Sequence, residues 1–165
     1  MKRIFLVTVL YFFISLTLFG QKNDDFPSFE RVYSSLAVHF KYPEELKDHC
    51  IPTITLMKLQ FDNKGEVQNI VFSDSAQPRF VDYMQKIKND LDFKSIYTDL
   101  KNKGYTSKTV LIPFQIDSEK IGECISTISS SNLKKVYLFS GKPSSGEYFL
   151  YPCIYFKIVV GRTNI

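Results

Sequence analysis

Apolar residues recur at helical spacing in two segments of the chain. Because the spacing is three or four positions in both, each segment carries one apolar face and predicts an amphipathic helix. The helices are expected over residues 27–40 and 78–93. Their apolar faces consist of Phe29, Val32, Tyr33, Leu36 and Phe40 in the first and of Phe80, Val81, Met84, Ile87 and Leu91 in the second. Asp25 and Pro27 favour a helix start at residue 27, and a short helix is expected over 43–49.

Alternating polar and apolar positions predict a β-hairpin. Its strands are expected over residues 53–61 and 67–72, on either side of the turn Asp62-Asn63-Lys64-Gly65, whose glycine accepts a positive φ angle. The alternation slips between Leu56 and Met57. The slip indicates either that both faces of the strand are partly covered at this point or that a bulge resets the phase.

A third strand is expected over residues 109–116, after a polar loop at 94–108. Its apolar positions on one side are Val110, Ile112, Phe114 and Ile116. Pro113 has no N–H to donate, so this strand fits an edge or a bulge better than the middle of a sheet. Further along, residues 121–128 show helical spacing, and strands are expected at 136–139 and 148–160, the latter broken by Pro152.

The N-terminus has the layout of a secretory signal peptide. Lys2 and Arg3 precede the uncharged segment 4–19, which is shorter than the roughly 20 residues of a membrane-spanning helix. Cleavage is expected after Gly20, which makes the protein exported, periplasmic or associated with the outer envelope. The alternative is an uncleaved anchor, in which case this segment is the only contact with a membrane. Residues 21–165 are expected to form a single domain.

Charge and cysteine content narrow the classes of function. Removal of Lys2 and Arg3 from the 21 Lys and Arg residues leaves 19, against 17 Asp and Glu residues. This near balance, with basic residues dispersed among acidic ones, does not favour a nucleic-acid partner.

The three cysteines Cys50, Cys124 and Cys153 are too widely spaced for a zinc site. In an oxidising compartment two of the three are expected to form a disulfide, and the spacing does not choose between the pairings.

The order of helix, Tyr-Pro, hairpin, helix and strand over residues 42–116 resembles the C-terminal domain family of TonB. The matching motifs are Tyr42-Pro43-Glu44-Glu45-Leu46, Phe61-Asp62-Asn63-Lys64-Gly65-Glu66-Val67, Leu91-Asp92-Phe93-Lys94 and Ile112-Pro113-Phe114. Among them Tyr42, Pro43, Gly65 and Val67 are expected to have structural roles. Ile51-Pro52 stands where the family has a glycine, and Leu91 and Ser95 stand where it has Trp and Pro. The chain therefore resembles a diverged, stand-alone member, with a core at 42–116 and a β extension at 117–165.

The resemblance implies an α+β fold, with a small antiparallel sheet and two main helices packed on one face. It also implies recognition of an envelope protein or peptide by strand pairing at the sheet edge. The candidate edge is residues 109–116, with Val110, Ile112, Pro113, Phe114 and Ile116. The alternative is that the strands at 136–160 cover this edge. The alternative function is a secreted binder of small ligands, with a pocket between the sheet and the C-terminal extension.

Catalytic and cofactor motifs are missing from the sequence. His39 and His49 are the only histidines and do not have the spacing of a metal pair. Gly-x-Ser-x-Gly, phosphate-loop and Gly-x-Gly-x-x-Gly motifs are absent. We therefore expect no catalytic, metal or cofactor residues, and a protein that is not an enzyme.

Overall fold

A computed structural model describes residues 26–161 of the chain. The expected signal peptide at 1–20 and the proposed cap Asp25 lie outside these residues. The helices are α2 Pro27–His39, α3 Glu44–Asp48, α4 Pro78–Ile87, α5 Lys94–Asn102 and α6 Ser130–Lys135. The strands are β1 Thr53–Phe61, β2 Val67–Phe72, β3 Thr109–Lys120, β4 Cys124–Ile125, β5 Leu138–Phe139, β6 Lys142–Pro143, β7 Phe149–Leu150 and β8 Ile154–Val160.

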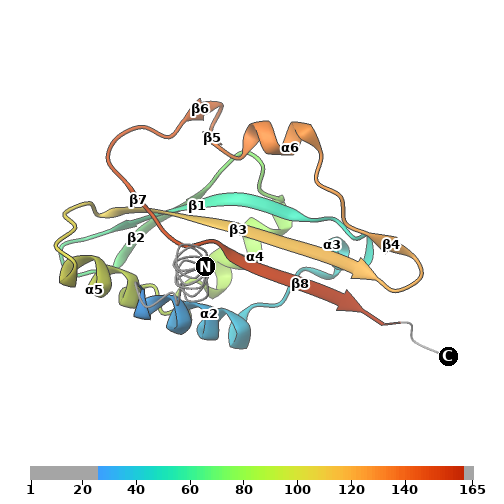
Figure 1. Ribbon diagram of the computed structural model, residues 1–165, viewed down its shortest axis with the longest axis horizontal. Helices are drawn as coiled ribbons and strands as arrows, with labels where there is room; N and C mark the ends of the chain where they lie inside the picture. The colour runs from blue at the N-terminus through green and yellow to red at the C-terminus, as the bar shows by residue number, and fades with distance from the viewer. Residues whose placement is uncertain (1–25, 162–165) are drawn as a thin grey trace, which may run out of the picture.

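The main sheet is built around β1 and β3 (Figure 1). β1 pairs antiparallel with β2 on one side and with β3 on the other. β7 and β8 add to the far side of β3 in parallel, and β4 forms a tight hairpin with the end of β3. The α+β fold class expected from the sequence is confirmed. The sheet is mixed rather than purely antiparallel, because the C-terminal strands run in the same direction as β3.

Helices α2, α4 and α5 cover one face of the sheet and enclose the main core. The core includes Leu36 from α2, Phe80 from α4 and Ile96 from α5, together with alternate residues of the strands. Alternation places Val110, Ile112, Phe114 and Ile116 on this helical face, where each is at most 1% exposed. This burial fixes which face of β3 points toward the helices.

A second, smaller apolar cluster lies on the opposite face of the sheet, which we call the open face. Leu56 and Leu111 meet Val136 and Phe139 from the segment that carries α6 and β5. Both faces of β1 are therefore covered around Leu56 and Met57, which explains the slip in alternation there. The bulge lies elsewhere, between Gln60 and Phe61 in the pairing with β2.

The N-terminus of α2 is capped from a distant part of the chain. The backbone N–H of Ser28 donates to the carboxylate of Asp99 on α5 at 2.6 Å. The Ser28 hydroxyl lies 2.8 Å from the hydroxyl of Tyr151, which follows β7. Burial, and secondarily the charge of Asp99, raises the pKa of Tyr151 to about 12. This buried polar contact joins α2, α5 and the C-terminal strands.

Several expected elements are different in the structure. The helix expected over 78–93 ends at Ile87, and a separate helix, α5, occupies part of the expected loop at 94–108. Residues 121–128 form the β3–β4 turn, strand β4 and the start of the loop before α6 instead of a helix. α5 forms because Ile96 and Leu100 are buried against the core, although most of its other residues are polar. β3 continues to Lys120, beyond the expected end at Ile116.

Cys50 and Cys124 form a disulfide, with their Cα atoms 6.1 Å apart. The bond connects the residue after the C-terminal turn of α3 to β4. Cys153, between β7 and β8, is free and exposed. The sequence leaves the pairing of the three cysteines open, and in the structure it is Cys50 with Cys124. Within residues 26–161 no helix has the length and apolar character needed to cross a membrane.

Candidate functional site

The strand expected to be the partner-binding edge lies inside the sheet. β3 pairs with β1 through residues 109–116 and with β7 and β8 on its other side. The expectation of an exposed edge at Val110, Ile112, Pro113, Phe114 and Ile116 is therefore wrong, and the C-terminal strands cover that edge. Pro113 lies between the residues of β3 that pair with β7 and those that pair with β8. Its missing N–H therefore removes little from the hydrogen bonding between these strands.

The sheet instead ends at β8, and most peptide groups on its outer edge have no partner among residues 26–161. In the described part of the chain β8 pairs with β3 alone. The C=O of Val160 accepts from Ile121 at 3.0 Å, so Val160 faces β3. Because peptide groups alternate in direction along a strand, Tyr155, Lys157 and Val159 face outward. The hydroxyl of Tyr33 on α2 donates to the C=O of Tyr155 at 3.4 Å, which agrees with this orientation and occupies that one acceptor.

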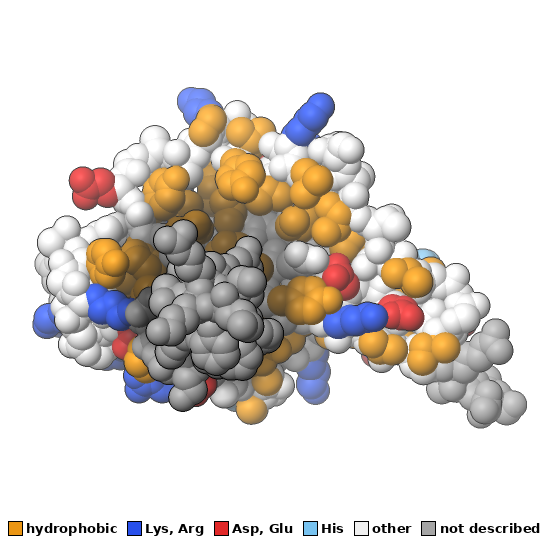
Figure 2. Space-filling view, viewed as in Figure 1, with side chains coloured by type: hydrophobic (Ala, Val, Ile, Leu, Met, Phe, Trp, Pro, Cys, Tyr) orange, Lys and Arg blue, Asp and Glu red, His pale blue; other side chains and the backbone are white. Residues whose placement is uncertain are grey.

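Apolar side chains surround this outer edge. Tyr33 stacks on Phe156 with ring centroids 4.9 Å apart on the helical face. On the open face Leu150, Tyr155 and Val159 are 60%, 46% and 52% exposed. Figure 2 shows hydrophobic side chains gathered over the region of β7 and β8 and below α6. Exposed apolar groups beside an unpaired strand are typical of a protein-binding surface.

The opposite edge of the sheet, β2, is less open to another strand. The side-chain amide of Gln85 on α4 donates to the C=O of Ile70 at 3.1 Å and occupies that acceptor. A shallow groove of about 400 Å3 separates β2 from α4. β2 is also shorter than β8 and has exposed polar residues at Gln68 and Asn69.

A hollow lies on the open face between the C-terminal parts of β3 and β8 and the segment after β4. Its volume is about 330 Å3. The residues that line it are Gln115, Asp117, Ser118, Glu119, Ile125, Ser126, Ile128, Tyr155 and Lys157. We call it the open-face hollow. All of its lining residues except Gln115 belong to the C-terminal extension at 117–165, whereas the alternative function expects a pocket between that extension and the rest of the sheet.

Asp117 is at the centre of the polar contacts in the open-face hollow. Its Oδ2 accepts from the Tyr155 hydroxyl at 3.1 Å and from the Gln115 amide at 3.4 Å. Hydrogen bonding to this carboxylate raises the pKa of the Tyr155 phenol above its usual value. Glu119 and Lys157 form an ion pair at 2.7 Å beside it. These residues share no local signal in the sequence, because their grouping depends on the pairing of β3 with β8.

The residues named from the family motifs have structural surroundings. The buried Tyr42 hydroxyl donates to the C=O of Ile51 at 2.6 Å and lies 2.9 Å from Thr53 Oγ1, and burial raises its pKa to about 12. Pro43 precedes the first residue of α3, and Val67 begins β2 and packs against the core.

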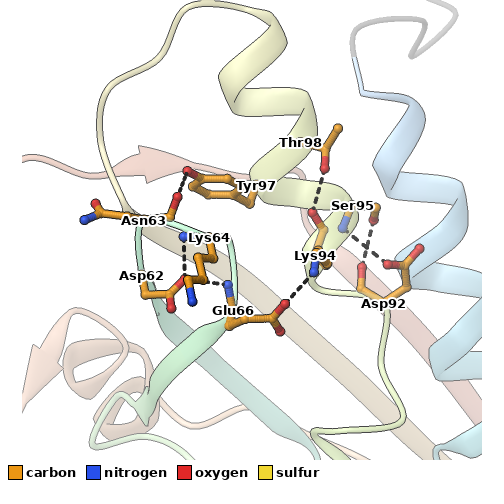
Figure 3. A network of polar contacts seen from close by, with 9 residues as sticks. All are labelled: Asp62, Asn63, Lys64, Glu66, Asp92, Lys94, Ser95, Tyr97 and Thr98. Carbon is orange, nitrogen blue, oxygen red and sulfur yellow. Dashed lines mark hydrogen bonds and ion pairs between the residues drawn. The ribbon is translucent and has the colours of Figure 1, made fainter.

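Gly65 has a φ of +81°, and a Cβ there would lie 2.3 Å from the ring of Tyr97. The turn around Gly65 is held by polar contacts (Figure 3). Asp62 accepts from the N–H groups of Lys64 and Glu66, each at 2.8 Å, and these bonds hold the pKa of its carboxyl below the usual value. The Tyr97 hydroxyl donates to the C=O of Asn63 at 3.0 Å. These contacts tie the hairpin to α5 and present no group arranged for chemistry.

Residues 26–161 contain no group of three or more His, Cys, Asp or Glu side chains that could hold a metal ion. His39 and His49 are both exposed, at the ends of α2 and α3. Cys153 is exposed as a residue, and partial burial of its sulfur raises the pKa of the thiol above its usual value.

Comparisons with models of protein families, with curated proteins and with solved structures find no match to this chain. The candidate functional surfaces therefore follow from its own geometry, which offers an unpaired strand edge at β8 and a polar hollow next to it.

Proposed function

We propose that this protein is an exported, non-enzymatic binding module of the bacterial envelope, similar to the C-terminal domain of TonB. It binds an extended segment of another polypeptide by strand pairing. The observation that carries the proposal is the outer edge of β8, at which Tyr155, Lys157 and Val159 direct their peptide groups away from the sheet. An extended segment placed there would satisfy these groups and add one strand to the sheet.

The composition of β8 supports the proposal. Natural sheet edges that stay unpaired are usually blunted by proline, bulges, several lysines or very short strands. β8 is 7 residues long, with the sequence Ile-Tyr-Phe-Lys-Ile-Val-Val, and has no proline and a single lysine. Its pairing with β3 is continuous from Ile154 to Val160, without a bulge. These features suit a strand that pairs with a partner during function.

The disulfide supports the proposed location. Stable disulfides occur mainly in oxidising compartments such as the bacterial periplasm. The Cys50–Cys124 bond is consistent with the export that the N-terminal sequence predicts.

The test is capture of partners from an envelope extract with three variants. Val159→Pro removes an outward N–H from the β8 edge, whereas Val159→Thr keeps it and provides the matched control. Gln68→Pro perturbs the β2 edge at the residue that the bulge leaves without a partner residue on β1. We expect mass spectrometry to find a partner with the unchanged protein, Val159→Thr and Gln68→Pro, and to find it strongly reduced with Val159→Pro. A partner retained by Val159→Pro would refute pairing at β8, and loss with Gln68→Pro alone would move the site to β2.

The open-face hollow favours a second candidate function, the binding of a small ligand. Its volume of about 330 Å3 is at the lower end of the range for ligand sites. Several polar side chains converge on it next to apolar ones. Recovery of a bound small molecule, and of no protein partner, would favour this function over strand pairing.

A further inference from the structure

The open-face hollow has three oxygens that are free to accept hydrogen bonds, beside the donors that remain on Lys157 and Gln115. Both bonds to Asp117 reach Oδ2, and Oδ1 receives no bond from the described residues. Glu119 uses Oε2 for Lys157, and its other oxygen has no partner in the same part of the chain. The Gln115 amide donates to Asp117 and leaves its own oxygen unused. These three oxygens could accept hydrogen bonds from a ligand that has several donors.

Asp117 has no ion-pair partner among residues 26–161. Its two contacts are with neutral groups, a phenol and an amide, and the nearby ammonium of Lys157 bonds to Glu119 instead. The side chain is half-buried, so water compensates its charge only in part. The carboxylates of Asp117 and Glu119 outnumber the one cation of the hollow, so the lining carries a net charge of about −1. A cationic ligand would balance that charge.

The walls of the hollow suit an apolar stem. Ile125 and Ile128 border it on the side of β4, and Ile125 is 71% exposed. Tyr155 borders it on the side of β8, with a ring that is about half exposed. Aliphatic carbons would remove water from these isoleucines, and the face of the tyrosine ring would attract a positive charge.

We propose that the open-face hollow binds an organic cation, a primary amine or guanidinium on a short aliphatic stem, with its charge at Asp117 and its stem against Ile125 and Ile128. This assigns a ligand class to the second candidate function and requires no change at the β8 edge. Anions are disfavoured by the two carboxylates, and neutral molecules leave the charge of Asp117 unbalanced.

The proposal is tested by following backbone amide signals during titration of the purified protein at fixed ionic strength. The probes are n-butylguanidinium, n-butylammonium, n-butanol and butyrate, which share one stem and differ in charge. We expect saturable shifts near residues 115–119 and 155–157 with the two cations only. Equal binding of n-butanol would overturn the charged role of Asp117, and tighter binding of butyrate would reverse the assigned ligand class.

Variants distinguish a specific site at Asp117 from a general attraction of cations to acidic residues. Asp117→Asn should weaken binding of the cations at least fivefold, Tyr155→Phe two- to threefold, and Asp117→Glu should restore part of the affinity. Asp82→Asn, at an exposed carboxylate on α4, is the matched control and should change nothing. Equal affinity for Asp117→Asn, with a folded circular dichroism spectrum, would overturn the proposal.

Partner capture distinguishes this proposal from strand pairing. The Asp117→Asn variant should still capture the polypeptide partner, because the peptide groups of β8 are unchanged in it. Loss of cation binding in this variant together with retained capture supports the assignment of the hollow. Loss of both would show that the hollow is part of the polypeptide site and would overturn its separate role.

Discussion

The Cys50–Cys124 disulfide allows the most quantitative test of the structure. It joins two positions 74 residues apart in the sequence. A cross-link over such a distance stabilises the fold mainly because it restricts the unfolded chain. The loop-entropy relation gives about 4 kcal/mol for a closed loop of this length at 25 °C. Apart from the disulfide, β4 is held to β3 by two residue pairs and by Ser126, whose N–H donates to the C=O of Ser118 at 2.8 Å.

The free energy of unfolding in urea measures this contribution. We expect the Cys50→Ala/Cys124→Ala double variant to lose roughly 3 to 4 kcal/mol, and reduction of the unchanged protein to give a similar loss. For a slope of about 2 kcal/mol per molar urea, the midpoint would fall by about 2 M. The slope itself should increase, because an unfolded chain without the cross-link exposes more surface.

Cys153→Ser is the control, because Cys153 is free and exposed. It should leave the midpoint unchanged within about 0.3 M of urea. A loss in Cys153→Ser as large as in the double variant, or equal midpoints for the oxidised and reduced protein, would refute the assigned pairing.

The remaining predictions concern packing and ionisation. Phe114→Ala should lower the free energy of unfolding by about 3 to 5 kcal/mol in urea melts, because the ring is 1% exposed in the core; a loss below about 1 kcal/mol would contradict this burial. Gly65→Ala should cost roughly 2 kcal/mol, since its φ is positive and the new Cβ would overlap Tyr97, and Tyr97→Ala in the same chain should recover the part due to the overlap, as thermal melts would measure. Tyr42 and Tyr151 have pKa values raised to about 12 by burial, above the ordinary value of 10. Their neutral forms therefore stabilise the fold fully below pH 10, and each contributes roughly 2 to 3 kcal/mol that is lost as pH rises from 10 through 12. Tyr151→Phe should show a smaller loss of stability over that range, and an unchanged pH profile would contradict the burial of this phenol.

Elements with local causes could be predicted from the sequence. The turn from Asp62 to Gly65 combines an aspartate that accepts nearby N–H groups with a glycine at positive φ. Both signals lie within a few positions, so β1 and β2 have the expected bounds. The first helix was predicted correctly for a similar reason, because Val32 and Leu36 mark a continuous apolar face.

Elements that depend on distant contacts could not be predicted in this way. α5 has only a few apolar residues. Ile96 and Leu100 stabilise a helix there only because they pack against the core. The N–H of Ser28 in α2 is satisfied by Asp99, which no local capping pattern indicates. The open-face hollow requires Asp117 and Tyr155 to meet across two strands, and parallel pairing leaves no short sequence signal.

The C-terminal extension changes where this sheet can meet a partner. Without β7 and β8, β3 would present a continuous unpaired edge, as its proline and its alternation indicate. With them, β3 becomes central, and the free peptide groups move one strand outward to β8. The same pairing brings Tyr155 and Lys157 beside Asp117 and creates the open-face hollow. One structural addition thus accounts for both proposed surfaces, and a chain that ends before Phe149 should lack the two of them while it exposes the edge of β3.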